Sequence, residues 1–463
     1  MKKETFIKRS VISAPLEEVF KWHSRSGALE RLSPPWEPLI IISPPKGILK
    51  GSKALMKIKQ GPISIKWAAE HTEYEENNFF KDVQRKGPFA SWEHSHYFKP
   101  INSSSCLMED QIEYSFLFNP FGNFFLKKNI ENKLERIFRY RHKTISEDLN
   151  AHLKSKDKKM NIVISGAGGV LGSVLIPFLT TGGHFVTKLV RRNPYLNKNE
   201  AFWDPYSNSI NKSILEESDA VIHLSGENIS EGRWTDDKKK LIIDSRVKTT
   251  SFICKTIANL NNPPKTLICA SAIGYYGDQG NTILDEDSPK GNDFISEVCS
   301  KWEQALEPVL RKGIKVIIMR FGVVFTPIGG ALNKLILPFK MGIGGKLGEG
   351  SQFISWISID DAIYAIYHAL LDSTIEGSVN VVSPFPVTNS ELTETLGKIL
   401  RRPTLMSIPS SVINIIFGQM GRELLLSSTR VKPQKLIDKG FVFRYPDLTN
   451  ALLHLLGNIN YEQ

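Results

Sequence analysis

Hydrophobic and polar positions follow two different patterns along the 463 residues of this chain. In the first third, stretches such as "TFIKRSVI" and "ASWEHSHYFKP" alternate hydrophobic and polar residues between clusters of Gly, Pro, Asn and Ser, which predicts antiparallel strands joined by turns. One helix is expected at "PLEEVFKWHS" and a long one over about 121–153. This order predicts an α+β domain over residues 1–155, whose sheet wraps the long helix and leaves an apolar cavity.

The second pattern begins after the charged stretch "KSKDKK", Lys154 to Lys159. Runs rich in β-branched residues, among them "MNIVISG", "DAVIHLSGE" and "IKVIIMRFGVVF", alternate with helical stretches. Such alternation is typical of a parallel sheet covered by helices on both faces. We therefore expect a Rossmann-type α/β domain over residues 160–376 and a smaller α/β tail over residues 377–463.

A glycine-rich loop, "ISGAGGVLGS", lies between the first predicted strand and helix of the second domain. Gly166, Gly169 and Gly172 have the spacing of a dinucleotide-binding loop, in which glycines permit a tight turn and a close approach of backbone to the pyrophosphate. Val170 and Leu171 would begin the helix whose N-terminus faces that anion. The loop predicts nucleotide binding, and a glycine-rich turn without a ligand is the alternative.

Residues at the ends of the following strands predict which cofactor is bound and what borders it. Arg191 and Arg192 end the second strand, where a carboxylate would select NAD and arginine suits the 2′-phosphate of NADP. NADP is therefore favoured over NAD, with a solvated arginine pair as the alternative. Because open α/β sheets bind ligands beyond the carboxyl ends of their strands, the cofactor is also expected to contact Leu224, Ser225, Gly226, Phe321 and Gly322. Arg246 is a further expected cofactor contact.

Several stretches in the same order, including "GAGGVLG", "SAIGYYGD" and "GGKLGEGSQFISWISIDD", resemble the atypical short-chain dehydrogenase/reductases called the epimerase family. The end of the chain resembles the uncharacterised tail domain of that family. The element order of residues 1–155 resembles START-like and polyketide-cyclase-like domains of the helix-grip superfamily. The resemblance implies an NADP site of Rossmann type, without indicating a particular substrate.

The wider superfamily uses a Ser, an Asn and a Tyr-x-x-x-Lys pair, in which the lysine helps the tyrosine to move a proton. In this chain the tyrosine and lysine positions fall on Ile295 and Cys299, and the resemblance assigns the serine to Ser271 and Arg246 to the position of the Asn. Tyr275, just after the strand, is a further candidate. Ser271, Tyr275 and Cys299 are thus candidate catalytic residues, and each has an alternative role in packing or strand capping.

Two functions are compatible with these residues. The first is an NADP-dependent oxidoreductase or epimerase acting on an unidentified small molecule, with nucleotide-sugars among the candidates. The second is a non-catalytic NADP(H)-binding regulatory protein whose first domain holds a lipid or another apolar ligand. The retained serine and glycine loop favour the first, and the missing tyrosine and lysine favour the second.

Composition limits the expected partners, metal sites and cellular location of the protein. A net charge of +11 is spread over scattered lysines, which disfavours nucleic acid as a partner. No apolar run approaches the ~20 residues of a membrane span, and four distant cysteines suggest neither disulfides nor a zinc site, so a cytoplasmic protein is expected. His94 and His96 share one strand face, but no third ligand is evident, so no metal is predicted.

Overall fold

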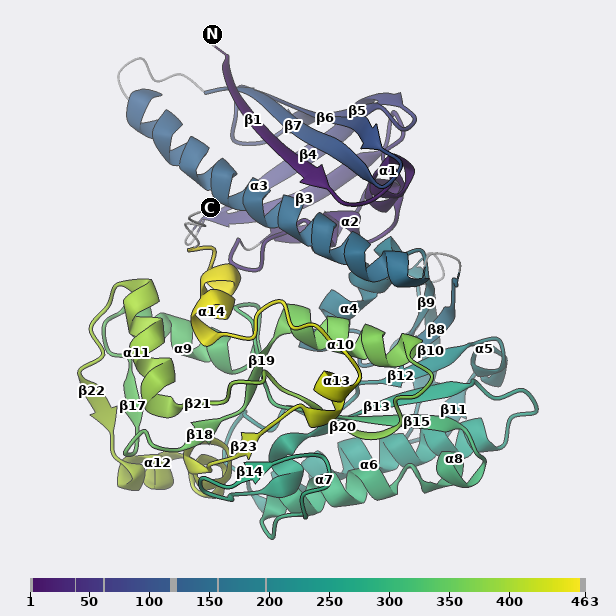
Figure 1. Cartoon of the computed structure of the whole chain (residues 1–463), viewed down its shortest axis with the longest axis vertical. Coiled ribbons are helices and arrows are strands. Elements are labelled where there is room, and N and C mark those ends of the chain that lie inside the picture. Colours follow the sequence, from purple (N-terminus) through teal and green to yellow (C-terminus); the bar gives the residue numbers. More distant parts are fainter. Residues whose placement is uncertain are drawn as a thin grey trace. The chain divides into compact units, whose positions relative to one another are not determined.

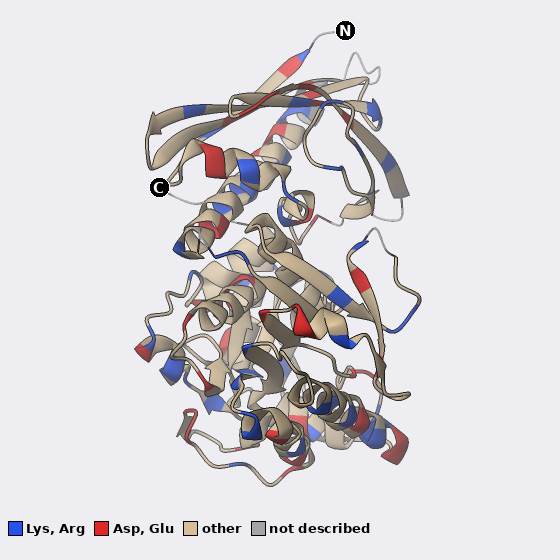
Figure 2. Ribbon diagram, turned by 90° about the vertical axis from the view of Figure 1, so that its right-hand side faces the viewer, with Lys and Arg blue, Asp and Glu red and all other residues tan. Residues whose placement is uncertain are grey.

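The computed structural model describes residues 3–37, 39–60, 63–116, 123–155, 158–195 and 198–458. The chain folds into two compact units, the first built mainly from residues before Lys159 and the second mainly from residues after Met160 (Figure 1). Basic and acidic side chains are interspersed along the elements of both units (Figure 2). Among the described helices, none combines the length and the apolar character that crossing a bilayer requires.

The first unit is an antiparallel sheet with one long helix, as the alternating pattern predicts. Its described strands pair in the order β1-β7-β6-β5-β4-β3-β2. Two short helices, α1 (Leu16–Ser24) and α2 (Ala28–Arg31), connect β1 to β2, and α3 (Asn123–His152) runs across the sheet (Figure 1). Residues 121 and 122 of the predicted long helix lie outside the described residues. The strands are β1 (Glu4–Ile12), β2 (Leu39–Ser43), β3 (Lys53–Gln60), β4 (Ile63–Glu75), β5 (Phe79–Lys86), β6 (Ser91–Asn102) and β7 (Ser105–Ser115).

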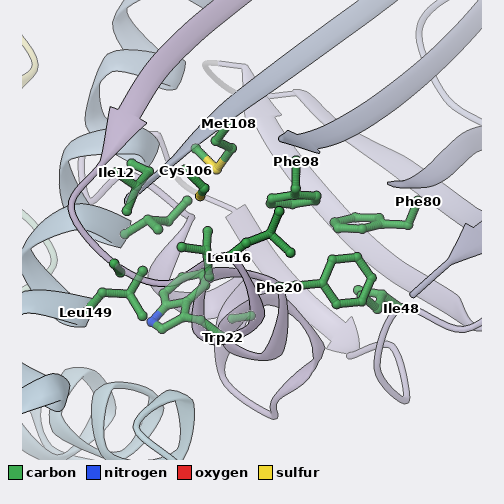
Figure 3. Packing of buried hydrophobic residues seen from close by; sticks show 14 residues of the cluster. Ile12, Leu16, Phe20, Trp22, Ile48, Phe80, Phe98, Cys106, Met108 and Leu149 are labelled. Carbon is green, nitrogen blue, oxygen red and sulfur yellow. The ribbon is translucent and has the colours of Figure 1, made fainter. Parts of the chain in front are cut away.

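The core of this unit lies where α1 and α3 meet the inner face of the sheet. Phe20 of α1 packs edge-on against Phe98 of β6, with ring centroids 5.3 Å apart (Figure 3). Trp22 and Leu149 close the same cluster and are almost fully buried. Burial of each such side chain stabilises the fold by about 1.5–3 kcal/mol, so the face of α3 that carries Leu149 is fixed against the sheet.

The second unit contains a mainly parallel sheet, which confirms the Rossmann-type prediction. Its described strands follow the order β11-β10-β9-β8-β12-β13-β15-β20, and only β11 is antiparallel to its neighbour. The strands are β8 (Asn161–Ser165), β9 (Phe185–Val190), β10 (Glu200–Asp204), β11 (Ser209–Ile210), β12 (Ala220–His223), β13 (Thr266–Ala272), β15 (Lys315–Phe321) and β20 (Gly377–Val381).

Helices cover this sheet. α6 (Asp236–Ala258) begins at Thr235, whose hydroxyl accepts from the backbone N–H of Lys238, and two aspartates follow in its first turn, where the helix dipole favours negative charge. α6 packs beside α7 and α8, and α10 lies on the opposite side of the sheet (Figure 1). The described helices of this region are α4 (Val170–Thr181), α5 (Lys212–Glu216), α7 (Phe294–Gln304), α8 (Glu307–Arg311), α9 (Gly330–Lys340) and α10 (Ile359–Leu371).

The last part of the chain interleaves with the main sheet. β20 is hydrogen-bonded to β15, so the sheet extends beyond the predicted domain boundary at residue 376. Three short strand pairs, β14–β23, β17–β22 and β18–β21, connect the tail to loops that precede residue 377, and a fourth, β16–β19, joins two segments that both precede it. These elements are β14 (Ile283–Leu284), β16 (Val323–Phe325), β17 (Gly345–Leu347), β18 (Phe353–Ile354), β19 (Trp356–Ser358), β21 (Val387–Thr388), β22 (Met406–Ile408), β23 (Arg430–Val431), α11 (Asn389–Leu400), α12 (Ser410–Phe417), η4 (Gly421–Leu426), α13 (Gln434–Asp438) and α14 (Leu448–Leu456).

Candidate functional site

The strand order reverses at β8, which places the candidate nucleotide site. β9 and β10 follow on one side of β8, whereas β12, β13 and β15 lie on the other. The ends of β8 and β12 are in register, with Ser165 opposite His223, so the loops that follow these strands lie side by side. Such a reversal is where open α/β sheets bind their ligands.

The glycine loop has the shape that a pyrophosphate site requires. Gly166 has a φ of +76°, and a Cβ there would lie 2.7 Å from the carbonyl carbon of Leu224. A Cβ on Gly172 would lie 2.5 Å from the carbonyl oxygen of Gly166. The backbone N–H of Gly169 donates to that same oxygen at 3.0 Å, and α4 then begins at Val170. The loop is therefore a tight turn that leads directly into a helix N-terminus.

Beneath the loop runs a buried chain of hydrogen bonds that the sequence did not reveal. Ser165 Oγ lies 2.6 Å from His223 Nδ1, and His223 Nε2 lies 3.0 Å from Thr250 Oγ1. Trp302 Nε1 donates to the same Thr250 oxygen at 2.9 Å. Burial lowers the pKa of His223 to about 4, so its imidazole is neutral at pH 7. These hydrogen bonds connect β8 and β12 to α6 and α7.

The two arginines after β9 have different surroundings. Both are exposed, but Arg192 forms an ion pair with Glu200 at 2.9 Å and its guanidinium lies 4.3 Å from the Tyr195 ring. This pairing lowers the pKa of Glu200 to about 2. Among the described residues, no carboxylate lies within ion-pair distance of Arg191. The pKa of Asp204 is lowered by its hydrogen bond from Ser207 and, to a smaller extent, by the charge of Arg191.

Arg246 reaches from α6 to the loop after β12. Its Nη2 donates to the carbonyl oxygen of Glu227 at 2.9 Å, and its guanidinium lies 5.1 Å from the Trp302 ring. A Cβ on Gly226 would lie 3.4 Å from the guanidinium carbon. Arg246 therefore holds the segment that contains Ser225 and Gly226, next to the glycine loop.

Ser271 faces a buried ion pair. Its hydroxyl donates to Glu303 Oε1 at 2.7 Å, and the side chain is only 3% exposed. Arg320 of β15 binds both oxygens of Glu303, at 2.9 and 2.7 Å. The same guanidinium lies 3.6 Å from the ring centroid of Tyr275 and donates to the hydroxyl of Tyr276 at 3.0 Å. No sequence motif identifies Glu303 or Arg320, because these residues come together only when folding packs α7 against β15.

α7 carries apolar contacts at the positions of the missing tyrosine and lysine. Ile295 and Cys299 are buried, together with Trp234 and Met420, in one hydrophobic cluster. Burial raises the pKa of the Cys299 thiol to about 12, so the thiol is protonated at pH 7. The other three cysteines are also buried and unpaired.

Phe321 and Gly322, at the end of β15, are the remaining predicted cofactor contacts. Phe321 is buried, and the N–H of Gly322 donates to the carbonyl oxygen of Val381 at 3.1 Å. A Cβ on Gly322 would lie 2.5 Å from the carbonyl oxygen of Ser355. The close approach of these two backbone segments therefore requires glycine at this position.

The first unit contains a cavity of about 440 Å³ between the sheet and α3. This volume is within the range of small-molecule sites. Most of its lining is apolar, and several charged or titratable side chains also line it. The apolar part includes Met56, Trp67, Phe80, Phe89, Trp92 and Ile137, and the polar part includes His23, His71, Asp82, His94, His96 and Arg141.

Comparison with known proteins gives matches over most of the chain. Residues 12–138 match the family of polyketide cyclase/dehydrase and lipid transport proteins, residues 162–381 the NAD dependent epimerase/dehydratase family, and residues 408–455 a domain of unknown function. These matches confirm the resemblances that the sequence motifs indicate.

Individual relatives also include epimerase family proteins. An epimerase family protein of Mycobacterium bovis is 36% identical over 291 residues, which cover 63% of this chain and 96% of that protein. The crystal structure of a nucleoside-diphosphate sugar epimerase from Corynebacterium glutamicum has a TM-score of 0.80 at 31% identity, over 98% of this chain and 90% of that chain. The human epimerase family protein SDR39U1, crystallised with NADPH, has a TM-score of 0.59 at 31% identity, over 64% of this chain and 99% of its own.

Proposed function

The chain belongs to the epimerase family, and on that premise we propose that it binds NADP(H) and acts as an oxidoreductase or epimerase on a small molecule. The observation that carries the proposal is the glycine loop at the reversal of strand order. N–H groups at the start of α4 would hold the pyrophosphate, and Arg191 would bind the 2′-phosphate. The NADPH in the human relative supports the choice of NADP over NAD.

The substrate class that we propose is a nucleoside-diphosphate sugar, following the name of the relative from Corynebacterium glutamicum. A bound nicotinamide would supply or accept a hydride. Tyr275 is the residue best placed to contact a substrate oxygen, because it is partly exposed and its hydroxyl has no hydrogen-bond partner among the described residues. The contact of its ring with Arg320 fixes its orientation.

A specific observation favours the second candidate, an NADP(H)-binding protein without turnover. The superfamily's proton-transferring pair is replaced by the buried Ile295 and by the Cys299 thiol, whose high pKa keeps it protonated. The Ser271 hydroxyl is already bound to Glu303. A proton needed in catalysis would then have to come from Tyr275, from the substrate itself or from water.

Titration of the full-length protein with NADPH and NADH, followed by nicotinamide fluorescence, tests cofactor binding. We expect NADPH to bind more tightly than NADH, and Arg191→Ala to weaken NADPH binding about tenfold or more, since one charge-assisted contact to phosphate is lost. Arg192→Ala is the matched control and should change the affinity much less, because Glu200 already engages that guanidinium. If neither nucleotide binds, the proposal is wrong, and equal losses in both variants would remove Arg191 from its proposed role.

One measurement distinguishes the enzyme from the regulatory protein without turnover. Protein loaded with NADPH or NADP⁺ is incubated with nucleoside-diphosphate sugars, and both the nicotinamide absorbance and the stereochemistry of the sugar are followed. A change in either that is lost in Tyr275→Phe supports the enzyme. Tight nucleotide binding without any change across the series would favour the regulatory protein.

For the first unit we propose a largely apolar small molecule as the ligand of the cavity, because aromatic and aliphatic side chains form most of its lining. A fluorescent fatty-acid analogue should bind the full-length protein, and Ala54→Trp should abolish that binding by filling the cavity, since Ala54 is a lining residue that is 6% exposed. Ile101→Trp, at an exposed position, is the control. Circular dichroism and thermal unfolding show whether both variants remain folded, and probe binding that survives Ala54→Trp would contradict the proposal.

A further inference from the structure

Three side chains on the cavity wall surround one point in space. Asp82 of β5 stands opposite His94 of β6 in the strand register, and His96 follows on the same face. Asp82 Oδ2 lies 3.5 Å from His94 Nδ1 and 3.5 Å from His96 Nε2. One ligand atom from each of the three residues lies within 4.8 Å of the others.

These separations suit metal ligands better than hydrogen-bond partners. An N–H···O hydrogen bond normally spans about 2.7–3.2 Å between heavy atoms. In a tetrahedral zinc site, bonds of about 2.0–2.2 Å place the ligand atoms roughly 3.3–3.6 Å apart. The two measured distances from Asp82 fall within that interval.

A second carboxylate, that of Asp110, lies beside both histidines and is hydrogen-bonded to His94. Asp110 Oδ1 lies 2.8 Å from His94 Nε2, in hydrogen-bond geometry, and 2.7 Å from His96 Nδ1, out of line for a hydrogen bond. Its other oxygen is 2.6 Å from His142 Nε2. A carboxylate on the far nitrogen is the usual partner of a metal-binding histidine, since it fixes the ring and leaves the other nitrogen as a ligand.

The negative charge of the cluster and its opening into the cavity both favour the binding of a cation. Two carboxylates, those of Asp82 and Asp110, belong to the cluster and interact with a single guanidinium, that of Arg141, whose Nε donates to the carbonyl oxygen of Leu32 at 3.0 Å. Asp82, His94 and His96 all line the cavity, whereas Asp110 does not. An ion held by the three would therefore keep a coordination position directed into the cavity.

We propose that Asp82, His94 and His96 bind a divalent transition-metal ion of the zinc class, with an open coordination position for an oxygen donor of the cavity's ligand. Three protein ligands and one exchangeable position are the arrangement of zinc sites that act on or bind small molecules. The sequence argued against a metal because the two histidines lacked a third ligand, and the strand register supplies it in Asp82. The inference does not depend on nucleotide binding in the second unit.

The test uses full-length protein without a histidine tag, stripped of metal by a chelator and titrated with Zn²⁺ in competition with a chromophoric chelator. We expect one equivalent per chain, and Asp82→Asn and His96→Gln should each weaken binding at least tenfold. His71→Gln, which changes another histidine of the cavity wall, should bind as the unmodified protein does. Circular dichroism and thermal unfolding show whether each variant is folded.

Replacement of zinc by Co²⁺ gives a second measurement, because the visible absorption of the ion reports its coordination. A tetrahedral spectrum that is absent in Asp82→Asn supports the site. Folded protein that takes up less than one equivalent of zinc would overturn the inference, and NADPH binding measured on the same sample reports separately on the proposed function. Equal zinc affinity in Asp82→Asn and the unmodified protein would overturn it as well.

Discussion

At the scale of single residues, the glycine loop depends on distances too short for any side chain. Gly172→Ala would place a methyl group 2.5 Å from the Gly166 carbonyl oxygen, so the start of α4 must shift. Overpacking of this kind costs about 1–3 kcal/mol, and we expect a comparable loss of stability together with weaker NADPH binding. Gly168→Ala is the control, because a Cβ there meets nothing within 4 Å. Thermal unfolding and NADPH titration of both variants measure the difference, and equal behaviour would contradict this account of the loop.

The residues of the candidate site were only partly predictable. Gly166 and Gly172 were predictable because their role is local, in a turn between a strand and a helix. The difference between Arg191 and Arg192 was not, since it depends on Glu200 in the following strand. Nor was the engagement of Ser271 by Glu303, which rests on the packing of α7 against the sheet.

At the scale of elements, the periodic pattern predicted most helices and strands, because each hydrophobic face faces one core. The alternating strands of the first unit and the β-branched strands of the second both appear at the expected positions. β20 was assigned to the tail, since a five-residue strand carries too little pattern to show which sheet it joins. Strand pairs of two or three residues, such as β18–β21, leave no periodic signal at all. Pairing partners are set by tertiary contacts that a linear pattern does not contain.

At the scale of the whole molecule, buried neutral histidines make stability depend on pH. Burial lowers the pKa of both His184 and His223 from 6.5 to about 4. Between pH 6.5 and 4 the unfolded chain therefore binds protons that the folded chain does not, and stability falls as the pH is lowered through this window. For the fully buried His223 the loss is up to about 3 kcal/mol.

Chemical denaturation at several pH values measures this effect. The free energy of unfolding should decline as the pH is lowered from 6.5 to 4, and His223→Gln should reduce this slope as well as the absolute stability. The slope is the informative quantity, because the variant also loses its hydrogen bonds to Ser165 and Thr250. An unchanged slope would mean that His223 takes up its proton as readily in the folded protein as in the unfolded chain.

The burial of all four cysteines has a practical consequence for this molecule. Burial raises the pKa of Cys106 to about 11 and that of Cys254 and Cys299 to about 12. Burial also raises the pKa of Cys269 well above its usual value. The nucleophilic thiolate is thus scarce, and each thiol is shielded from reagents in solution. A cysteine introduced on the surface, for example at the exposed Leu337, would be the fastest-reacting thiol of the chain. The natural sequence therefore already provides a background for site-specific attachment of spectroscopic labels.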